Sequence, residues 1–166
     1  MTETKTLSNL LDEYLEHLRN LNFSGHTIKR KLYACGAFVA YLGRRFNADT
    51  ACAIRREHLF AWQKHLMESR TREGTPLRER SLNSSIAGVR GFLRHLALKG
   101  HILKSSLEAL LYVKEPKMLP TSVLTDAQVR KVLGRIDTGS LLGQRDRTSL
   151  ELLYSSGLRA SEIVNL

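Results

Sequence analysis

The sequence predicts an all-α fold in which a bundle of four helices is followed by shorter helical segments. Three observations predict it. Apolar residues recur at helical spacing in four long segments, and no segment alternates apolar and polar residues as a strand would. Two of the three prolines, Pro116 and Pro120, lie in a short stretch after the fourth segment. We therefore expect a helical domain over residues 1–113, a linker over 114–124 and a second domain over 125–166.

The first two helices are each expected to begin after a hydroxyl residue that caps the N-terminus. Thr6 precedes an apolar face made of Leu7, Leu10, Leu11, Tyr14, Leu15, Leu18 and Leu21. Ser24 precedes a longer face made of Ile28, Leu32, Cys35, Phe38, Val39, Leu42 and Phe46. Residues 47–53 are expected to connect the second helix to the third.

The third helix is expected over residues 56–69 and the fourth over residues 80–99. The third would turn Leu59, Phe60, Leu66 and Met67 inward, with Trp62 as a packing residue. A polar segment with Gly74 and Pro76 reads as an exposed loop. The fourth would turn Leu82, Ile86, Val89, Phe92, Leu93 and Leu96 inward, and Gly100 stands where a glycine often ends a helix.

After the linker, Thr125 is a candidate cap for a short helix that ends near residue 133. Residues 136–142 form a turn-rich break, and a further helix is expected over residues 143–155. Gly157 would end it, and a last helix would begin near Arg159.

The charge balance indicates a polyanionic partner. Lys and Arg number 26 against 16 Asp and Glu, which gives a net charge of +10 and favours nucleic acid, although a merely solubilising surface charge is the alternative. The uncharged run over residues 32–43 is too short to span a bilayer, and residues 1–9 lack the order of a signal peptide, so a cytoplasmic protein is expected. Cys35 and Cys52 form no CxxC pair, which excludes a cysteine zinc cluster, and both are expected to be buried.

Two helical faces combine basic residues with small ones and carry no acid. Opposite the apolar face of the second helix stand His26, Arg30, Tyr33, Ala37, Tyr41 and Arg44, beside Thr27. On the fourth helix the corresponding stripe is Arg80, Asn83, Ser84, Ala87, Arg90, Gly91 and Arg94. Small residues between arginines let a phosphate backbone come close, so both stripes are candidate contacts with double-stranded DNA.

One motif points to a family. Residues 145–166 include an apolar helix that ends in Leu-Leu-Tyr154, followed by Gly157-Leu-Arg159-Ala-Ser-Glu162. This stretch resembles the tyrosine recombinase (phage-integrase) family, in its Xer-like or integron-integrase-like branch. The segments from Ser24 and from Ser81, and the proline-containing linker, are similar to the same family in the same order.

The resemblance implies a four-helix, SAM-like core-binding domain followed by the first helices of an incomplete catalytic domain. Family members recombine DNA by attack of a tyrosine hydroxyl on a phosphate, with arginines, a lysine and histidines assisting and with no metal or nucleotide cofactor. Arg159 matches the first of those arginines, and a bidentate guanidinium suits the charge that builds on the phosphate oxygens. No His-x-x-Arg motif occurs in the chain, and Tyr154 does not match the nucleophile, so this chain alone is expected not to cut DNA.

Three functions remain open from the sequence. The chain can be the DNA-binding portion of a recombinase or integrase, which takes part in DNA recombination and integration. It can be a non-catalytic module that pairs with full-length recombinase subunits. It can also be the remnant of a disrupted gene.

Overall fold

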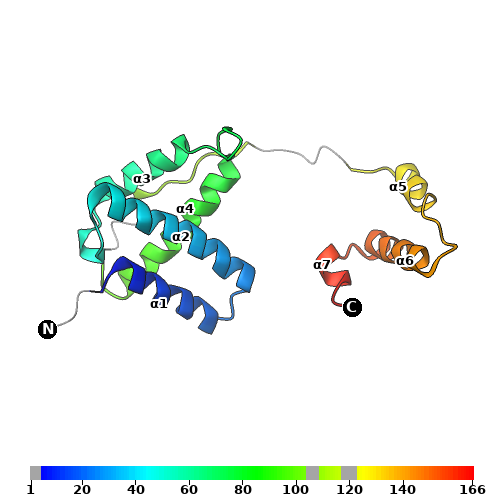
Figure 1. Cartoon of the computed structure of the whole chain (residues 1–166), viewed down its shortest axis with the longest axis horizontal. Helices are drawn as coiled ribbons and strands as arrows, with labels where there is room; N and C mark the ends of the chain where they lie inside the picture. Colours follow the sequence, from blue (N-terminus) through cyan, green and yellow to red (C-terminus); the bar gives the residue numbers. More distant parts are fainter. Residues whose placement is uncertain (1–4, 104–108, 117–122) are drawn as a thin grey trace. The chain divides into compact units, whose positions relative to one another are not determined.

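The computed structural model describes residues 5–103, 109–116 and 123–166, and divides the chain into two compact units, Met1–Pro116 and Lys117–Leu166 (Figure 1). Over the described residues, secondary structure is helical apart from two isolated β-bridges, Thr6 with Thr50 and Arg70 with Pro76. The all-α prediction is therefore confirmed. The boundary between the units falls within the predicted linker, most of which lies outside the described residues.

Over the described residues of the first unit, four α-helices follow the predicted order. They are α1 (Leu7–Asn20), α2 (Gly25–Phe46), α3 (Arg56–Glu68) and α4 (Glu79–Leu98), with a 3₁₀ turn η1 (Ala51–Ala53) between α2 and α3. Thr6 Oγ1 accepts the Asn9 N–H at 3.3 Å and Ser24 Oγ accepts the Thr27 N–H at 3.2 Å, so both predicted caps are confirmed.

Two residues in the left-handed region end the longer helices. Asn47, at φ 51°, closes α2, and its N–H donates to the Gly43 carbonyl. Gly100, at φ 79°, follows α4 in the position that the sequence predicted.

The core of the first unit draws on all four helices and on a later segment. Leu59, Ile86 and Phe92 are among its fully buried side chains. Ala109 and Leu110, which come after α4, are 1% and 0% exposed and belong to the same cluster. The Trp62 ring meets Phe38 edge-on at 5.2 Å, which confirms its predicted packing role.

Helices α2 and α4 approach each other closely because their contact is lined by small residues. A Cβ placed on Gly88 would lie 2.8 Å from the Cβ of Ala34. Cys35 Sγ donates to the Gly88 carbonyl at 3.5 Å, and burial raises the pKa of this thiol to about 12. Since the contact runs along the Ala34 side of α2, Leu32 turns outward and is 43% exposed, and its prediction as a core residue was wrong.

Four other residues predicted to be buried are also exposed: Leu21, Phe60, Met67 and Cys52, of which Leu21, the C-cap of α1, is 57% exposed. Phe60 and Met67 are 48% and 43% exposed, because α3 packs through Leu59 and Trp62. The Arg56 guanidinium lies over the exposed Phe60 ring at 5.5 Å. Cys52 is exposed in the η1 turn, where its sulfur lies 3.3 Å from Thr50 Oγ1.

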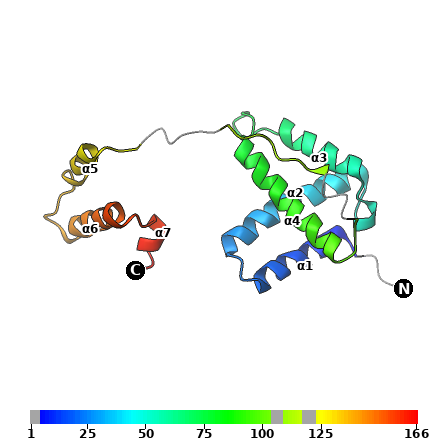
Figure 2. The ribbon, with the colours of Figure 1, turned by 180° about the vertical axis from the view of Figure 1, so that it is seen from behind.

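The segment 109–115, here called the strap, runs past α3 and α4 (Figure 2). The side-chain amide of Gln63 on α3 bonds both to the Leu111 carbonyl, at 2.8 Å, and to its N–H, at 3.2 Å. Asn83 on α4 makes the same pair of bonds to Val113, at 2.8 and 2.7 Å. Arg90 donates to the Leu110 carbonyl. The side-chain amides of Gln63 and Asn83 thus bind two alternate residues of the strap, Leu111 and Val113. The sequence patterns predicted no contact between this segment and the helices.

A histidine pair packs where α1 meets α4. His95 is 8% exposed and lies 4.9 Å from the ring of His17 and 5.3 Å from that of Tyr14. Burial lowers the pKa of His95, and the cations around it lower it further. The groups near it that titrate or carry charge are Glu13, Tyr14, His17, Lys99 and His101.

This histidine is expected to make the first unit less stable in acid. Its lowered folded-state pKa means that the unfolded chain binds the proton more readily, so stability is full above the usual imidazole pKa of about 6.5 and declines as pH falls through it. Thermal unfolding followed between about pH 8 and pH 5 measures the decline, and His95→Gln should flatten it. Equal slopes for the wild-type chain and this variant would contradict the assignment to His95.

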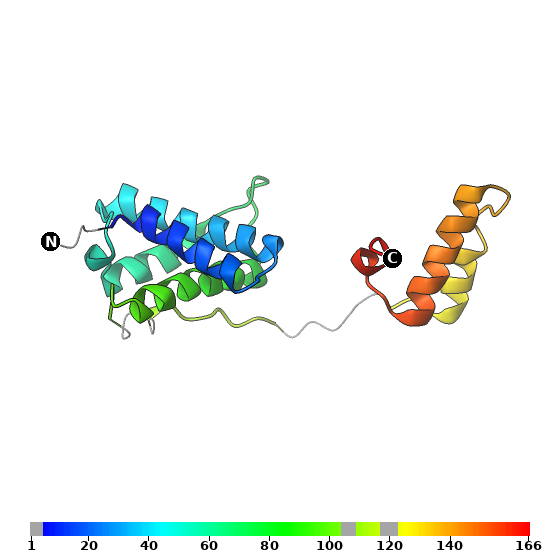
Figure 3. The same cartoon turned by 90° about the horizontal axis from the view of Figure 1, so that it is seen from below.

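The second unit contains α5 (Asp126–Leu133), α6 (Leu141–Ser156) and α7 (Ala160–Ile163). Thr125 caps α5 as predicted, whereas α6 begins two residues before the predicted start because Ser140 Oγ accepts the Gly143 N–H at 3.1 Å. Figure 3 shows α5 and α6 side by side, where Tyr154 donates to Asp126 Oδ1 at 2.6 Å. In the described residues, no helix has both the length and the apolar character needed to cross a membrane.

Candidate nucleic-acid interface

A groove of about 340 Å³ lies between α2 and α4, and we call it the α2–α4 groove. It is lined by residues of both predicted stripes and by the end of the strap: Thr27, Arg30, Lys31, Arg80, Asn83, Ser84, Ala87, Gly88 and Glu115. Five of these, Thr27, Arg30, Arg80, Asn83 and Ser84, are predicted DNA contacts. The close approach of α2 and α4 at Gly88 is what brings the two stripes together.

Hydrogen bonds inside the α2–α4 groove hold its cations in place. Arg30 Nη2 donates to Ser84 Oγ at 2.5 Å, and Lys31 Nζ donates to the Ala87 carbonyl at 3.2 Å. Each contact joins a cation of α2 to α4. Their remaining N–H groups are the donors that a phosphate oxygen requires.

A second groove of about 370 Å³ continues from the first, and we call it the central groove. Arg30 and Ser84 line both grooves. Tyr33 and Arg44, also predicted contacts, line the central groove together with Tyr41 and with His65 of α3. Tyr33 is 77% exposed, so its ring is accessible to a ligand.

Three predicted contacts lie outside these two grooves. His26 is exposed in the first turn of α2, and Arg94 is exposed on α4. Arg90 is half-buried, since its guanidinium is bonded to the strap at Leu110 and lies 5.3 Å from the centre of the Tyr112 ring. Arg90 and Asn83 therefore both hold the strap, a role that the stripe on α4 did not reveal.

The sequence alone suggested that the stripe on α4 carries no acid, but the folded chain places a carboxylate next to it. The strap carries Glu115 beside it: Glu115 Oε1 accepts from Asn83 Nδ2 at 2.8 Å, and its other oxygen lies 3.8 Å from Arg80 Nε. This carboxylate is 32 residues from Asn83 in sequence, so helical periodicity could not place it. Sequence reasoning likewise missed Lys31 and His65, which fell outside the two stripes.

In the second unit, Arg159 is the N-cap of α7 and its side chain is 83% exposed. Arg159 Nη1 lies 3.1 Å from Glu162 Oε1, and Glu162 Oε2 accepts the Arg159 N–H at 2.8 Å. Glu162 therefore binds both the backbone and the guanidinium of Arg159. Among the described residues, no group of three or more His, Cys, Asp or Glu side chains is placed to hold a metal ion.

Comparison with known proteins gives consistent matches along the chain. It is 31% identical over 160 residues to tyrosine recombinase XerC 2 of Ralstonia nicotianae, a match that covers 96% of this chain and 46% of the relative. It is 32% identical over 161 residues to tyrosine recombinase XerC of Xylella fastidiosa and 29% identical over 163 residues to tyrosine recombinase XerD of Listeria innocua, each covering 96% of this chain and 52% of the relative. No family model and no solved structure matches the chain.

Fold and surface together define a helical protein whose first unit presents basic grooves between its helices. The relatives identify the family: this chain belongs to the tyrosine recombinases. It spans about half the length of the curated relatives that it matches.

Proposed function

We propose that this chain is the DNA-binding portion of a site-specific tyrosine recombinase, and that its first unit binds duplex DNA through the α2–α4 and central grooves. The observation that carries the proposal is the continuity of these grooves, which share Arg30 and Ser84 and hold arginines from both helices. Family membership supports the same substrate. With duplex DNA as substrate, the proposal also places the chain in the cytoplasm.

The residue types suit a phosphate backbone. Arginine side chains at 30, 44 and 80 supply charge and paired donors, while the hydroxyls of Thr27 and Ser84 supply neutral hydrogen bonds. Glu115 opposes them with a single carboxylate. The cations outnumber the acid, so the grooves favour a polyanion over a neutral ligand.

Arg159 is the one residue to which we assign a catalytic role within a recombinase. Its exposed guanidinium, oriented by Glu162, suits the non-bridging oxygens of a phosphate under attack. The other catalytic groups of the reaction have no matched position in this sequence. We therefore assign DNA binding, and not strand transfer, to the chain by itself.

A second candidate function is a module that pairs with recombinase subunits. It is favoured by the apolar surface of the second unit, where Leu141, Val164 and Leu166 are 84%, 82% and 87% exposed. Binding of a recombinase subunit without any binding of DNA would favour this function over the first.

The DNA-binding proposal predicts a steep dependence of affinity on salt. Each phosphate contact releases a condensed counterion, so the logarithm of the binding constant should fall linearly with the logarithm of salt concentration, with a slope near −0.9 per contact. Arg30→Gln with Arg80→Gln should reduce the slope by about 1 to 2. Fluorescence anisotropy with a labelled duplex measures both quantities.

A matched control removes the same charge elsewhere. Arg19→Gln with Lys99→Gln alters two exposed cations that line neither groove, and it should leave the slope unchanged. A wild-type chain that fails to bind duplex DNA at low salt, or a control that loses as much as the groove variant, would refute the proposal.

A further inference from the structure

A third groove, of about 640 Å³, lies where the C-terminal end of α2 passes α3, and we call it the α2–α3 groove. Tyr41, Arg44 and His65 line both this groove and the central one. The three grooves therefore follow one another along α2. From Arg30 to Arg45 the helix advances about 22 Å, so groups at its two ends can contact phosphates several positions apart on a duplex.

Cations dominate the α2–α3 groove. Arg44 and Arg45 lie in the last turn of α2, and Lys64 lies on α3. The one acid among the lining residues, Glu68, lies 3.9 Å from Lys64, and the two side chains are 65% and 79% exposed. Such an exposed pair is worth little, so a phosphate can compete with Glu68 for Lys64. Basic residues are favoured in the last turn of a helix, and this accounts for Arg44 and Arg45 without a ligand. Lys64 lies on another helix, so the end of α2 does not explain its presence in the groove.

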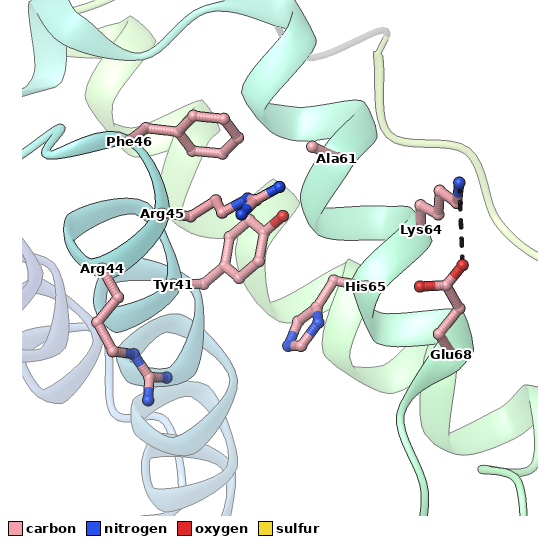
Figure 4. A pocket seen from close by; sticks show the side chains of 8 residues that line it. All are labelled: Tyr41, Arg44, Arg45, Phe46, Ala61, Lys64, His65 and Glu68. Atoms are coloured by element: carbon pink, nitrogen blue, oxygen red, sulfur yellow. Dashed lines mark ion pairs between the residues drawn. The ribbon is translucent and has the colours of Figure 1, made fainter.

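Two pairs of stacked rings lie in or beside the α2–α3 groove. The Tyr41 and His65 rings stack at 4.7 Å, and Phe46 stacks on His58 at 4.1 Å. Figure 4 shows Tyr41, Arg45 and His65 turned toward the space between α2 and α3, and Arg44 turned away from them. Arg44 Nε donates to the Ala40 carbonyl at 3.2 Å, which fixes its guanidinium between the two grooves.

We propose that the α2–α3 groove is an additional binding site for the phosphate backbone of duplex DNA, in which Arg45 and Lys64 contact phosphates next to those held by the central groove. This inference rests on the proposed function and deepens it. Neither residue lies on a stripe that the sequence singled out. Arg44, shared between the grooves, links the two sets of contacts.

The test compares salt dependence in three chains. Relative to the wild-type protein, Arg45→Gln with Lys64→Gln should make the salt dependence less steep, with the magnitude of the slope smaller by about 1 to 2. The same variant should reduce affinity at least about fivefold at about 0.1 M salt. The control Arg19→Gln with Lys99→Gln should match the wild-type slope. Circular dichroism and thermal unfolding establish that each variant is folded.

A variant that is expected to raise DNA affinity keeps the test independent of any loss of folding. Glu68→Gln removes the acid of the groove and frees Lys64, so it should raise DNA affinity about twofold or more without changing the helical content. If the wild-type chain binds DNA but Arg45→Gln with Lys64→Gln behaves like the control, the groove is not a phosphate site although the proposed function stands. If the wild-type chain binds no DNA, both fail.

Discussion

Replacing Gly88 by leucine is expected to destabilise the first unit by about 1–3 kcal/mol or more, because the new side chain would enter the contact between α2 and α4. Its Cβ would begin 2.8 Å from the Ala34 Cβ, a distance that real Cβ contacts do not reach, so one helix must move. Movement would also break the bond from Cys35 Sγ to the Gly88 carbonyl. The midpoint of thermal unfolding should fall by roughly 4–8 °C for each kcal/mol lost.

The same substitution at Gly36 provides the control. Gly36 also lies inside a helix, α2, but a Cβ there would meet nothing within 4 Å. Because leucine is a better helix former than glycine by about 0.5–1 kcal/mol, Gly36→Leu should be neutral or stabilising. A Gly88→Leu chain that unfolds at the same temperature as Gly36→Leu would show that the α2–α4 contact is not closely packed.

The 166-residue polypeptide is expected to leave supercoiled plasmid intact and to form no covalent link to DNA. Phosphoryl transfer requires a positioned nucleophile and a group that accepts its proton. Tyr154 is the one tyrosine of the second unit, and its hydroxyl donates to Asp126 Oδ1 at 2.6 Å. That bond and the charge of Asp126 raise the pKa of Tyr154, so its hydroxyl keeps its proton at neutral pH.

The expected loss of DNA-cleaving activity is large. Removing one member of a catalytic unit can cost as much rate as removing all of them, several powers of ten, so a polypeptide that holds Arg159 without its partners is expected to show no measurable rate. Incubation with a nicked suicide duplex, followed by denaturing electrophoresis, measures the outcome. An adduct that survives denaturation, and that disappears in Tyr154→Phe, would overturn the assignment of the chain as inactive by itself.

Helix boundaries were largely predictable because local chemistry determines them. Thr6, Ser24 and Thr125 cap helices through their own side chains, and Gly100 and Gly157 adopt positive φ at helix ends. The buried face of α2 was predicted less well. Helical periodicity does not show that Gly88 of α4 packs against Ala34 of α2. With that side of α2 turned toward α4, Leu32 is left exposed.

The candidate DNA-binding surface was predictable in its charge but not in its shape. Arginines opposite an apolar face are visible in the sequence, and Arg30, Arg44 and Arg80 line grooves as that pattern suggests. The roles of Asn83 and Arg90 depend on partners 30 and 20 residues away in sequence. Only the folded path of the strap shows that these two side chains bind the chain itself.

The clamped strap redefines where the first unit ends as an independently folding piece. Leu110 is fully buried, and the amides of Gln63 and Asn83 would lose their bonds to Leu111 and Val113 if the chain stopped after α4. A polypeptide cut at Leu98 would therefore expose apolar core and leave two amides unpaired. The shortest stretch expected to fold alone runs through Glu115, so expression boundaries and protease-resistant fragments should fall beyond that residue.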